Sequence, residues 1–316
     1  MKKVLLALAL LLAAGAGVLY AFPGTLLAGA QLVEQTRAGL TEKTLRVDGL
    51  DIHYYEGGPS EAETVLLVHG FGADKDNWPS FARHLTSRYH VLIPDLPGFG
   101  ASSQPAGISY DVGTQAERLV NFSKALGIGK LHLVGNSMGG QIVALFAARH
   151  PQQVFSLALF DNAGVTAPHQ SELFERLLKG APNPLVLTHA EDFPALLDFV
   201  FYQKPPMPER LQHYLGERGV ARSGLNAQIF SQLRERYIPL EPELPKISAP
   251  TLLLWGDRDR VLDISSIDVM KALLPHPSVV VIRDCGHVPM IERPEESARY
   301  YLSFLDGVQA TKLAGH

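Results

Sequence analysis

Short runs of consecutive apolar residues alternate with helix-length segments through most of this chain. Strands buried on both faces read as such continuous runs, whereas half-exposed strands alternate apolar and polar residues. Segments such as Gly113–Leu126 and Ser265–Leu274 lie between the runs and have the length and spacing of helices. The pattern predicts an α/β fold, with a mostly parallel sheet covered by helices on both faces. The predicted buried strands are Thr64–Val68, Val91–Ile93, Leu131–Val134, Ser156–Phe160, Thr251–Trp255 and Val279–Ile282.

Two segments ahead of the first buried run follow a different pattern. Thr44–Val47 and Ile52–Tyr55 alternate in the manner of half-buried strands, and Asp48-Gly49 lies between them. An Asp-Gly pair between alternating segments is a strong signal for a tight turn. We therefore predict an antiparallel hairpin at the start of the sheet.

Residues 164–245 interrupt the alternation of strands and helices. Three stretches there read as helices, namely Leu173–Leu178, Leu196–Tyr202 and Ile229–Leu233, and several prolines separate them. A helical insertion rich in Phe and Leu between two sheet strands is typical of a cap over a binding site. An ordinary helical subdomain without a gating role would produce the same pattern.

The N-terminus combines two lysines with a long apolar run. Lys2 and Lys3 precede Val4–Phe22, which is nineteen residues without a charge. A helix of that length spans about 28 Å, close to the hydrocarbon thickness of a bilayer. The competing interpretation is a cleaved secretory signal with its cleavage site at Ala28-Gly29-Ala30, although the apolar part of such a signal is usually shorter. We expect a membrane anchor.

The basic residues near this helix predict its orientation. Lys2 and Lys3 flank it on one side, and the nearest basic residue on the other side is Arg37. Basic residues stay on the cytoplasmic side, so we expect a single pass through the inner membrane with the body of the protein in the periplasm. Small residues recur every four positions and would let two such helices approach closely, which raises the hypothesis of a homodimer, although Ala and Gly are common in apolar segments. These small residues are Ala9, Ala13, Gly17 and Ala21.

These patterns divide the chain into four parts. Residues 1–30 form the anchor or signal helix, and residues 31–43 form a juxtamembrane connector. Residues 44–163 and 246–316 form the α/β core, and residues 164–245 form the helical cap.

Composition excludes several classes of function. The 316 residues suffice for one large α/β domain with an insertion. A net charge of −4 and the absence of a basic run argue against a nucleic-acid partner. The only cysteine, Cys285, leaves no internal disulfide and no Cys-x-x-Cys motif for a metal or redox site. We expect no metal and no organic cofactor.

The strongest chemical signal is Gly135-Asn136-Ser137-Met138-Gly139, which follows the run Leu131–Val134 and leads into the apolar segment Gln141–Ala148. A strand that ends in Gly-x-Ser-x-Gly and turns directly into a helix is a nucleophile elbow. The flanking glycines avoid a collision with neighbouring backbone, and the serine hydroxyl stands at a helix N-terminus. Ser137 is therefore the candidate nucleophile, and a mere helix cap is the alternative.

A serine nucleophile needs a base to accept its proton and an acid to orient that base. Of the twelve histidines, His287 follows the last predicted strand on a short loop, where this type of sheet collects catalytic groups. The acid should follow the preceding strand, where both Asp257 and Asp259 occur, and spacing alone does not choose between them. We expect Glu292 to cap the helix that starts near Pro294.

A second loop completes the candidate site. His69-Gly70-Phe71-Gly72 ends the run that begins at Thr64. We expect the backbone N–H groups of Phe71 and Met138 to form an oxyanion hole, because the glycines let the backbone approach the serine closely.

These motifs, in this order, resemble the α/β-hydrolases of the bacterial esterase and lipase type. In that family the acid corresponds to the second Asp of the Gly-x-x-Asp pattern. The resemblance therefore implies a triad of Ser137, Asp259 and His287, with Asp257 as the alternative acid, and makes Asp95 a structural loop residue. The matching blocks are His69–Gly72, Asp95–Ser102, Gly135–Gly139, Gly256–Asp259 and Gly286-His287.

The segment Leu66–Trp78 and the anchor-like N-terminus resemble lipase family V, and the whole chain is similar to a membrane-anchored bacterial phospholipase A. The resemblance implies hydrolysis of acyl esters, either membrane glycerophospholipids or medium-chain esters, without a cofactor. Serine rather than aspartate at position 137 argues against relatives that resemble dehalogenases and epoxide hydrolases. The alternatives are a soluble secreted esterase, a lactone or C–C bond hydrolase, and a membrane-tethered binding module. We expect acyl chains to contact Phe193, Leu196, Leu197, Phe199 and Phe201 of the cap.

Overall fold

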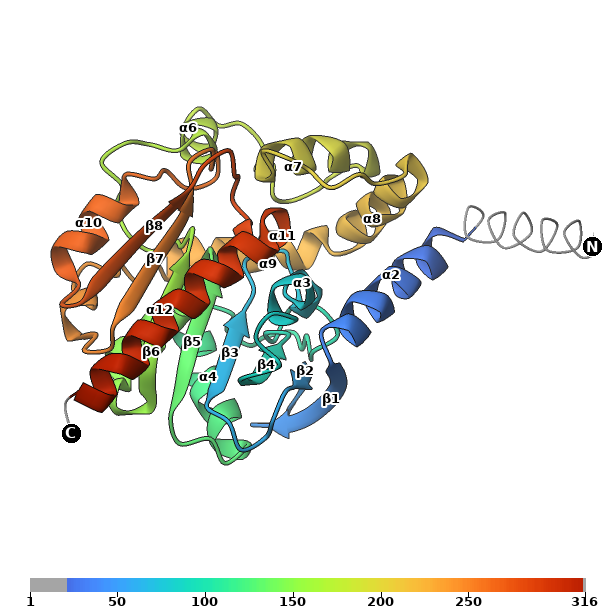
Figure 1. Cartoon of the computed structure of the whole chain (residues 1–316). Coiled ribbons are helices and arrows are strands. Elements are labelled where there is room, and N and C mark those ends of the chain that lie inside the picture. Colours follow the sequence, from blue (N-terminus) through green and yellow to red (C-terminus); the bar gives the residue numbers. More distant parts are fainter. Residues whose placement is uncertain (1–21, 315–316) are drawn as a thin grey trace, which may run out of the picture.

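The computed structural model describes residues 22–314, and it describes side chains through residue 310. An eight-stranded sheet runs through the molecule in the order β1-β2-β4-β3-β5-β6-β7-β8 (Figure 1). β1 pairs with β2 and β2 with β4 in antiparallel fashion, and all other neighbours are parallel. The strands are β1 (Leu40–Val47), β2 (Leu50–Gly57), β3 (Thr64–Val68), β4 (His90–Pro94), β5 (Leu131–Asn136), β6 (Val154–Phe160), β7 (Thr251–Gly256) and β8 (Pro277–Ile282).

Both faces of the central strands are covered, which confirms the predicted fold class. Alternate residues of a strand point to opposite faces, so a run of apolar residues supplies both cores. In β3, Leu66 and Val68 pack with α4 and α5, while Val65 and Leu67 pack with α3 and α12. α12 crosses the face turned to the viewer in Figure 1. The helices are α3 (Pro79–Ala82), α4 (Val112–Ala125), α5 (Met138–Arg149), α10 (Ser266–Leu273), α11 (Pro289–Glu292) and α12 (Pro294–Ala314).

The segment between β6 and β7 is helical and lies beyond the carboxyl ends of the parallel strands (Figure 1). The sequence missed α8, because its interior contains Gly216 and Gly219. Gly216 is needed for close packing, since a methyl group there would lie 2.2 Å from the carbonyl oxygen of Ala190. That this insertion is a lid remains a prediction. It contains α6 (Glu172–Leu178), α7 (Phe193–Val200), α8 (Glu209–Ala221) and α9 (Ser223–Glu235).

The N-terminal part departs from the predicted boundaries. Helix α2 spans Pro23–Arg37, so the expected boundary between residues 30 and 31 lies inside one helix, and β1 begins at Leu40. The hairpin itself is confirmed, with Asp48 and Gly49 in its turn. Among residues 22–314, no helix is both long and apolar enough to cross a bilayer. Most of the predicted anchor (residues 1–30) and all of its row of small residues fall on residues 1–21, outside the described part.

Candidate active site

The elbow joins β5 to α5 through a single strained residue. Ser137 has φ of 55° and ψ of −122°, a left-handed conformation that costs free energy in a residue other than glycine. Two backbone hydrogen bonds hold it: its N–H donates to the oxygen of Phe160, and its oxygen accepts from the N–H of Ala163, each at 3.0 Å. Ser137 is partly exposed between buried neighbours. The serine side chain is therefore accessible on a rigid frame.

The two glycines that flank the serine are sterically required. A methyl group on Gly135 would lie 2.4 Å from the oxygen of Gly139, and one on Gly139 would lie 2.4 Å from the oxygen of His69. Both distances are far below van der Waals contact. This close backbone packing is the steric reason that the sequence pattern predicts.

His287 and Asp259 meet at the carboxyl ends of β7 and β8. Nδ1 of His287 lies 2.8 Å from Oδ2 of Asp259, and both side chains are buried. The other oxygen, Oδ1, accepts hydrogen bonds from the N–H groups of Val261 and Leu262 at 2.7 and 3.1 Å. The carboxylate of Asp259 is therefore fixed in orientation before any substrate arrives.

Asp257, the alternative acid, makes no hydrogen bond to His287 and has other partners. Its Oδ1 accepts a hydrogen bond from the N–H of Asp284 at 2.7 Å and lies 3.7 Å from Arg258. Asp257 thus organises the loop after β8, while Asp259 contacts the imidazole.

The proposed oxyanion loop is held by a buried histidine. Nε2 of His69 accepts the N–H of Leu96 at 3.0 Å, so Nδ1 carries the ring proton and donates to the oxygen of Gly70 at 2.8 Å. Burial lowers the pKa of His69, which keeps the ring neutral. The carbonyl of Gly70 and the N–H of Phe71 belong to the same trans peptide and point in opposite directions. Because the carbonyl points toward His69, the N–H of Phe71 points away from His69. Gly70 lies against the elbow, since a methyl group on it would be 3.1 Å from Cβ of Ser137.

Asp95 is a structural residue of the neighbouring loop. Its buried carboxylate accepts hydrogen bonds from the backbone N–H groups of Lys75 and Ala101 at 2.7 and 2.8 Å, and from Nζ of Lys75 at 3.1 Å. Gly100 is required beside it, because a methyl group there would lie 2.1 Å from Cγ of Asp95.

The expectation that Glu292 caps the following helix is wrong. Its carboxylate instead accepts the backbone N–H groups of Gly286, Tyr202 and Gln203 at 3.0, 3.1 and 2.8 Å. These donors come from the His287 loop and from the chain just after α7. The carboxylate reaches them because Glu292 lies at the end of the separate short helix α11. Glu292 therefore ties the cap segment to the loop that carries the histidine.

The five apolar cap residues occupy different environments. Phe199 is buried in a small cluster with Leu173 and Val261, and Phe201 packs against the core. Leu197 is buried, while Phe193 and Leu196 are half-buried. Their contact with a substrate remains a prediction.

Sequence reasoning missed an aromatic residue of α9. The ring of Phe230 lies 5.6 Å from the ring of Phe71, and the ring of Phe99 lies 6.2 Å from it. The only local signal was its place in the helical stretch that ends near Leu233. Contact between α9 and the loop of Phe71 depends on how the cap folds back onto the core.

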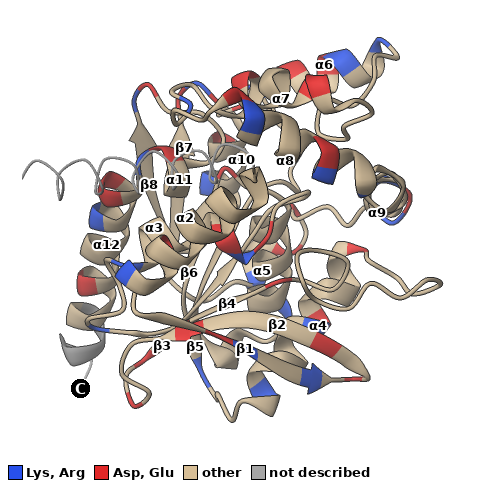
Figure 2. Ribbon diagram, turned by 90° about the vertical axis from the view of Figure 1, so that its right-hand side faces the viewer, with Lys and Arg blue, Asp and Glu red and all other residues tan. Residues whose placement is uncertain are grey.

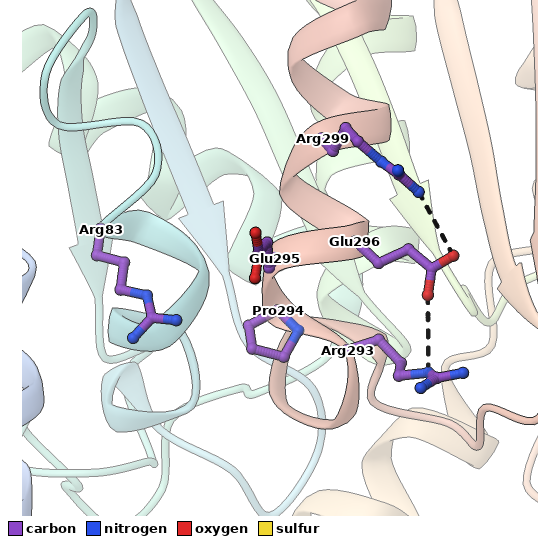
Figure 3. A pocket seen from close by; sticks show the side chains of 6 residues that line it. All are labelled: Arg83, Arg293, Pro294, Glu295, Glu296 and Arg299. Carbon is purple, nitrogen blue, oxygen red and sulfur yellow. Dashed lines mark ion pairs between the residues drawn. The ribbon is translucent and has the colours of Figure 1, made fainter.

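A surface hollow of about 520 Å³ lies between α3 and α12 (Figure 3). Its wall includes Arg293 and Arg299, both 3.7 Å from Glu296, and Figure 2 shows charges of both signs along α12. Ion pairing within the wall leaves this hollow without a strong net charge. None of its residues belongs to the candidate active site.

Comparisons with known proteins agree with the fold and the motifs. The alpha/beta hydrolase fold family matches residues 63–294. Lipase 1 of Psychrobacter immobilis is 35% identical over 285 residues, covering 88% of each chain. Human monoacylglycerol lipase ABHD6 is 29% identical over 268 residues, covering 81% of this chain and 79% of that protein.

A solved structure covers almost the whole chain. It is a membrane phospholipase A described as a novel bacterial virulence factor, 66% identical, with a TM-score of 0.90 over 98% of this chain and 99% of the other. The family match and the lipase relatives lead to one conclusion. This chain belongs to the alpha/beta hydrolase fold family and is a serine hydrolase of the lipase and esterase type.

Proposed function

We propose that this protein hydrolyses acyl esters of membrane glycerophospholipids, and medium-chain esters, through an acyl-enzyme on Ser137, Asp259 and His287. The observation that carries the proposal is the 2.8 Å contact between Nδ1 of His287 and Asp259, on the sheet edge where the elbow exposes Ser137. This contact assigns the proton of the ring to Nδ1, which leaves Nε2 free to accept a proton.

In the first half of the reaction, Nε2 of His287 takes the hydroxyl proton as Oγ of Ser137 bonds to the ester carbon. The carbonyl electron pair moves onto its oxygen, and the N–H groups of Phe71 and Met138 would stabilise that charge. When the intermediate collapses, the C–O bond to the alcohol breaks, and the alcohol oxygen takes the proton from His287. A lysophospholipid or other alcohol leaves, and the acyl group stays on Ser137.

In the second half, water replaces the alcohol. His287 takes a proton from the water as its oxygen bonds to the acyl carbon, and the same two N–H groups hold the new oxyanion. Collapse returns the proton to Oγ of Ser137 and releases the fatty acid. Asp259 stabilises the imidazolium in both halves and does not itself become protonated.

Two observations support a lipid substrate. The membrane phospholipase A structure matches 98% of this chain, and the relatives include lipases. The aromatic rings of Phe230 and Phe71 meet beside the proposed oxyanion loop, where an acyl chain would lie. An N-terminal anchor in the inner membrane, with the catalytic domain in the periplasm, would bring the site to its substrate.

The test uses full-length protein with vesicles of phosphatidylethanolamine and phosphatidylglycerol, a p-nitrophenyl butyrate assay and a matched Ser137→Ala protein. Release of fatty acid and lysophospholipid by the wild-type protein alone is the expected result. Turnover of the small ester without any phospholipid hydrolysis would favour the soluble-type esterase. Turnover of neither, with activity on a lactone or a vinylogous diketone, would move the assignment to lactone or C–C bond hydrolysis. A protein inactive on all of them would be a binding module.

A further inference from the structure

Asp161 is a buried acid that the proposed mechanism does not use. It follows β6 directly and has φ of 44°, and its side chain is fully buried. Its N–H donates to the oxygen of Leu254 and its Oδ1 accepts the N–H of Gly256, at 3.0 and 2.9 Å. Asp161 thus joins the end of β6 to the end of β7 and holds an unusual backbone conformation there.

The carboxyl group of Asp161 lies close to two of the candidate catalytic groups. Single ligand atoms of Asp161, Asp259 and His287 all lie within 4.8 Å of one another. Oδ2 of Asp161 is buried and accepts no hydrogen bond from any donor within residues 22–310. An ionised carboxylate with such an oxygen would be costly, because charge would be buried without compensation.

The surroundings of Asp161 favour its neutral form. Burial raises its pKa well above the ordinary value of 3.8, and the negative charge of Asp259 raises it further. Glu292 acts in the same direction from α11. The neighbouring thiol of Cys285 is also neutral, since burial raises its pKa. Two close carboxyl groups then carry one negative charge, which stays on Asp259 beside His287.

A neutral carboxyl group is a donor as well as an acceptor. Oδ1 of Asp161 is taken by the N–H of Gly256, so the proton belongs on Oδ2, the oxygen without a donor. We propose that Asp161 is a positioning residue whose Oδ2–H donates a hydrogen bond to the carboxylate of Asp259 and holds it against His287. This inference rests on the proposed triad. Asp161 touches neither substrate nor Ser137 in this role and acts through Asp259.

Two substitutions separate the donor role from simple packing. Asp161→Asn keeps both contacts, because the amide oxygen can accept from Gly256 and the amide N–H can donate to Asp259. Asp161→Leu keeps the number and branching of the side-chain heavy atoms and loses both. Asp111→Asn is the matched control, since Asp111 is a buried acid that caps α4 through the N–H of Thr114, and the same acid-to-amide change there should leave the pH profile unaltered.

The readout is kcat per folded active site, with KM and the pH profile, for full-length protein on p-nitrophenyl butyrate. A hydrogen bond to a charged group contributes enough that Asp161→Leu should lower kcat about tenfold or more with little change in KM. Asp161→Asn should restore kcat to within about threefold of the wild type. It should also extend activity to higher pH, because the wild-type protein loses its donor when Asp161 ionises.

Three results would overturn the inference. Asp161→Asn could be as inactive as Asp259→Asn, which would mean that Asp161 works as an anion. Asp161→Leu could keep the wild-type kcat. Asp161→Asn could lose activity at the same alkaline pH as the wild type. If Asp161→Leu does not fold, the pH profile of Asp161→Asn alone decides. Ser137→Ala in the same assay tests the triad separately, since its activity would refute the proposed function whatever the Asp161 variants do.

Discussion

Asn136, the residue just before the candidate nucleophile, is hydrogen-bonded through its side chain to the loop that carries the candidate base, His287. Its Nδ2 donates to the backbone oxygen of His287 at 3.0 Å and to the oxygen of Phe160 at 3.1 Å. Asn136 is buried, so these bonds are shielded from water. The elbow and the histidine loop, 151 residues apart in sequence, are therefore held as one unit.

In the proposed covalent route Ser137 and His287 act together, so removing either should remove nearly all activity. We expect Ser137→Ala and His287→Ala each to lower kcat on p-nitrophenyl butyrate by about 10⁴-fold or more, and the double variant to lose little beyond that. Circular dichroism of each variant checks its fold. A folded Ser137→Ala protein with near-normal turnover would remove Ser137 from the mechanism.

The two aspartates after β7 should differ strongly. Asp259→Asn replaces the acceptor for Nδ1–H of His287 by an amide that favours the wrong tautomer, so kcat should fall by about 10⁴-fold. Asp257→Asn disturbs the hydrogen bond from Asp284 and the ion pair with Arg258, neither of which involves His287, so it should cost less than about tenfold. Parallel kcat measurements decide, and the reverse ranking would transfer the role to Asp257.

The aromatic residues of the cap should separate into two kinds. Phe230→Ser removes the ring beside Phe71, so activity on octanoate esters should fall more than activity on acetate esters. Phe199→Ser disrupts a buried cluster, so it should mainly lower the melting temperature. Chain-length profiles and thermal unfolding of both variants test this. An equal loss on both esters for Phe230→Ser would show that this ring does not contact the acyl chain.

Asp161 should make stability depend on pH in a defined direction. The pKa of Asp161 is higher in the folded protein than its ordinary value of 3.8, so the folded state binds this proton more tightly. Its contribution to stability is complete below 3.8 and is lost as pH rises toward the folded pKa. Asn does not titrate, so the melting temperature of Asp161→Asn should rise relative to that of the wild type as the pH increases above 3.8. A constant or shrinking difference would contradict the raised pKa.

The N-terminal segment should anchor the protein and allow it to dimerise. Intact protein should crosslink as a homodimer in membranes, whereas Gly17→Ile should reduce the yield, because a bulky side chain separates closely packed helices. A variant lacking residues 1–21 is the matched control. It retains α2, whose Gln31 donates to Asp76 at 2.6 Å and whose Glu34 accepts from Ser80 at 2.8 Å. Equal dimer yields would exclude the small-residue interface, and a mature chain that starts after Ala30 would exclude the anchor.

The sequence by itself determined the parts of this protein that depend on neighbouring residues. Continuous apolar runs predict buried strands, and all six of them form strands of the sheet. The prediction of burial is wrong for the last, β8, because β8 lies at the edge of the sheet and Val279 and Val281 are exposed there. The elbow was equally readable from its local pattern, and the steric demand on Gly135 does arise nearby, from the oxygen of Gly139. The demand on Gly139 comes instead from the oxygen of His69 at the end of β3, which only the fold brings there. Asp48-Gly49 likewise determined the hairpin through local backbone preference.

Only the tertiary structure decided which polar groups meet across the ends of the strands. Asp257 and Asp259 are alike in sequence, and they differ because one accepts from Asp284 and the other faces His287. From the sequence we expected Glu292 to cap a helix. In the structure its carboxylate accepts hydrogen bonds from the N–H groups of Tyr202 and Gln203, which follow α7. Asp161 carried no local signal, and Phe230 carried only its place in a predicted helical stretch. Their surroundings come from segments far apart in sequence, and those surroundings set the charge of a buried acid and the contact of a ring.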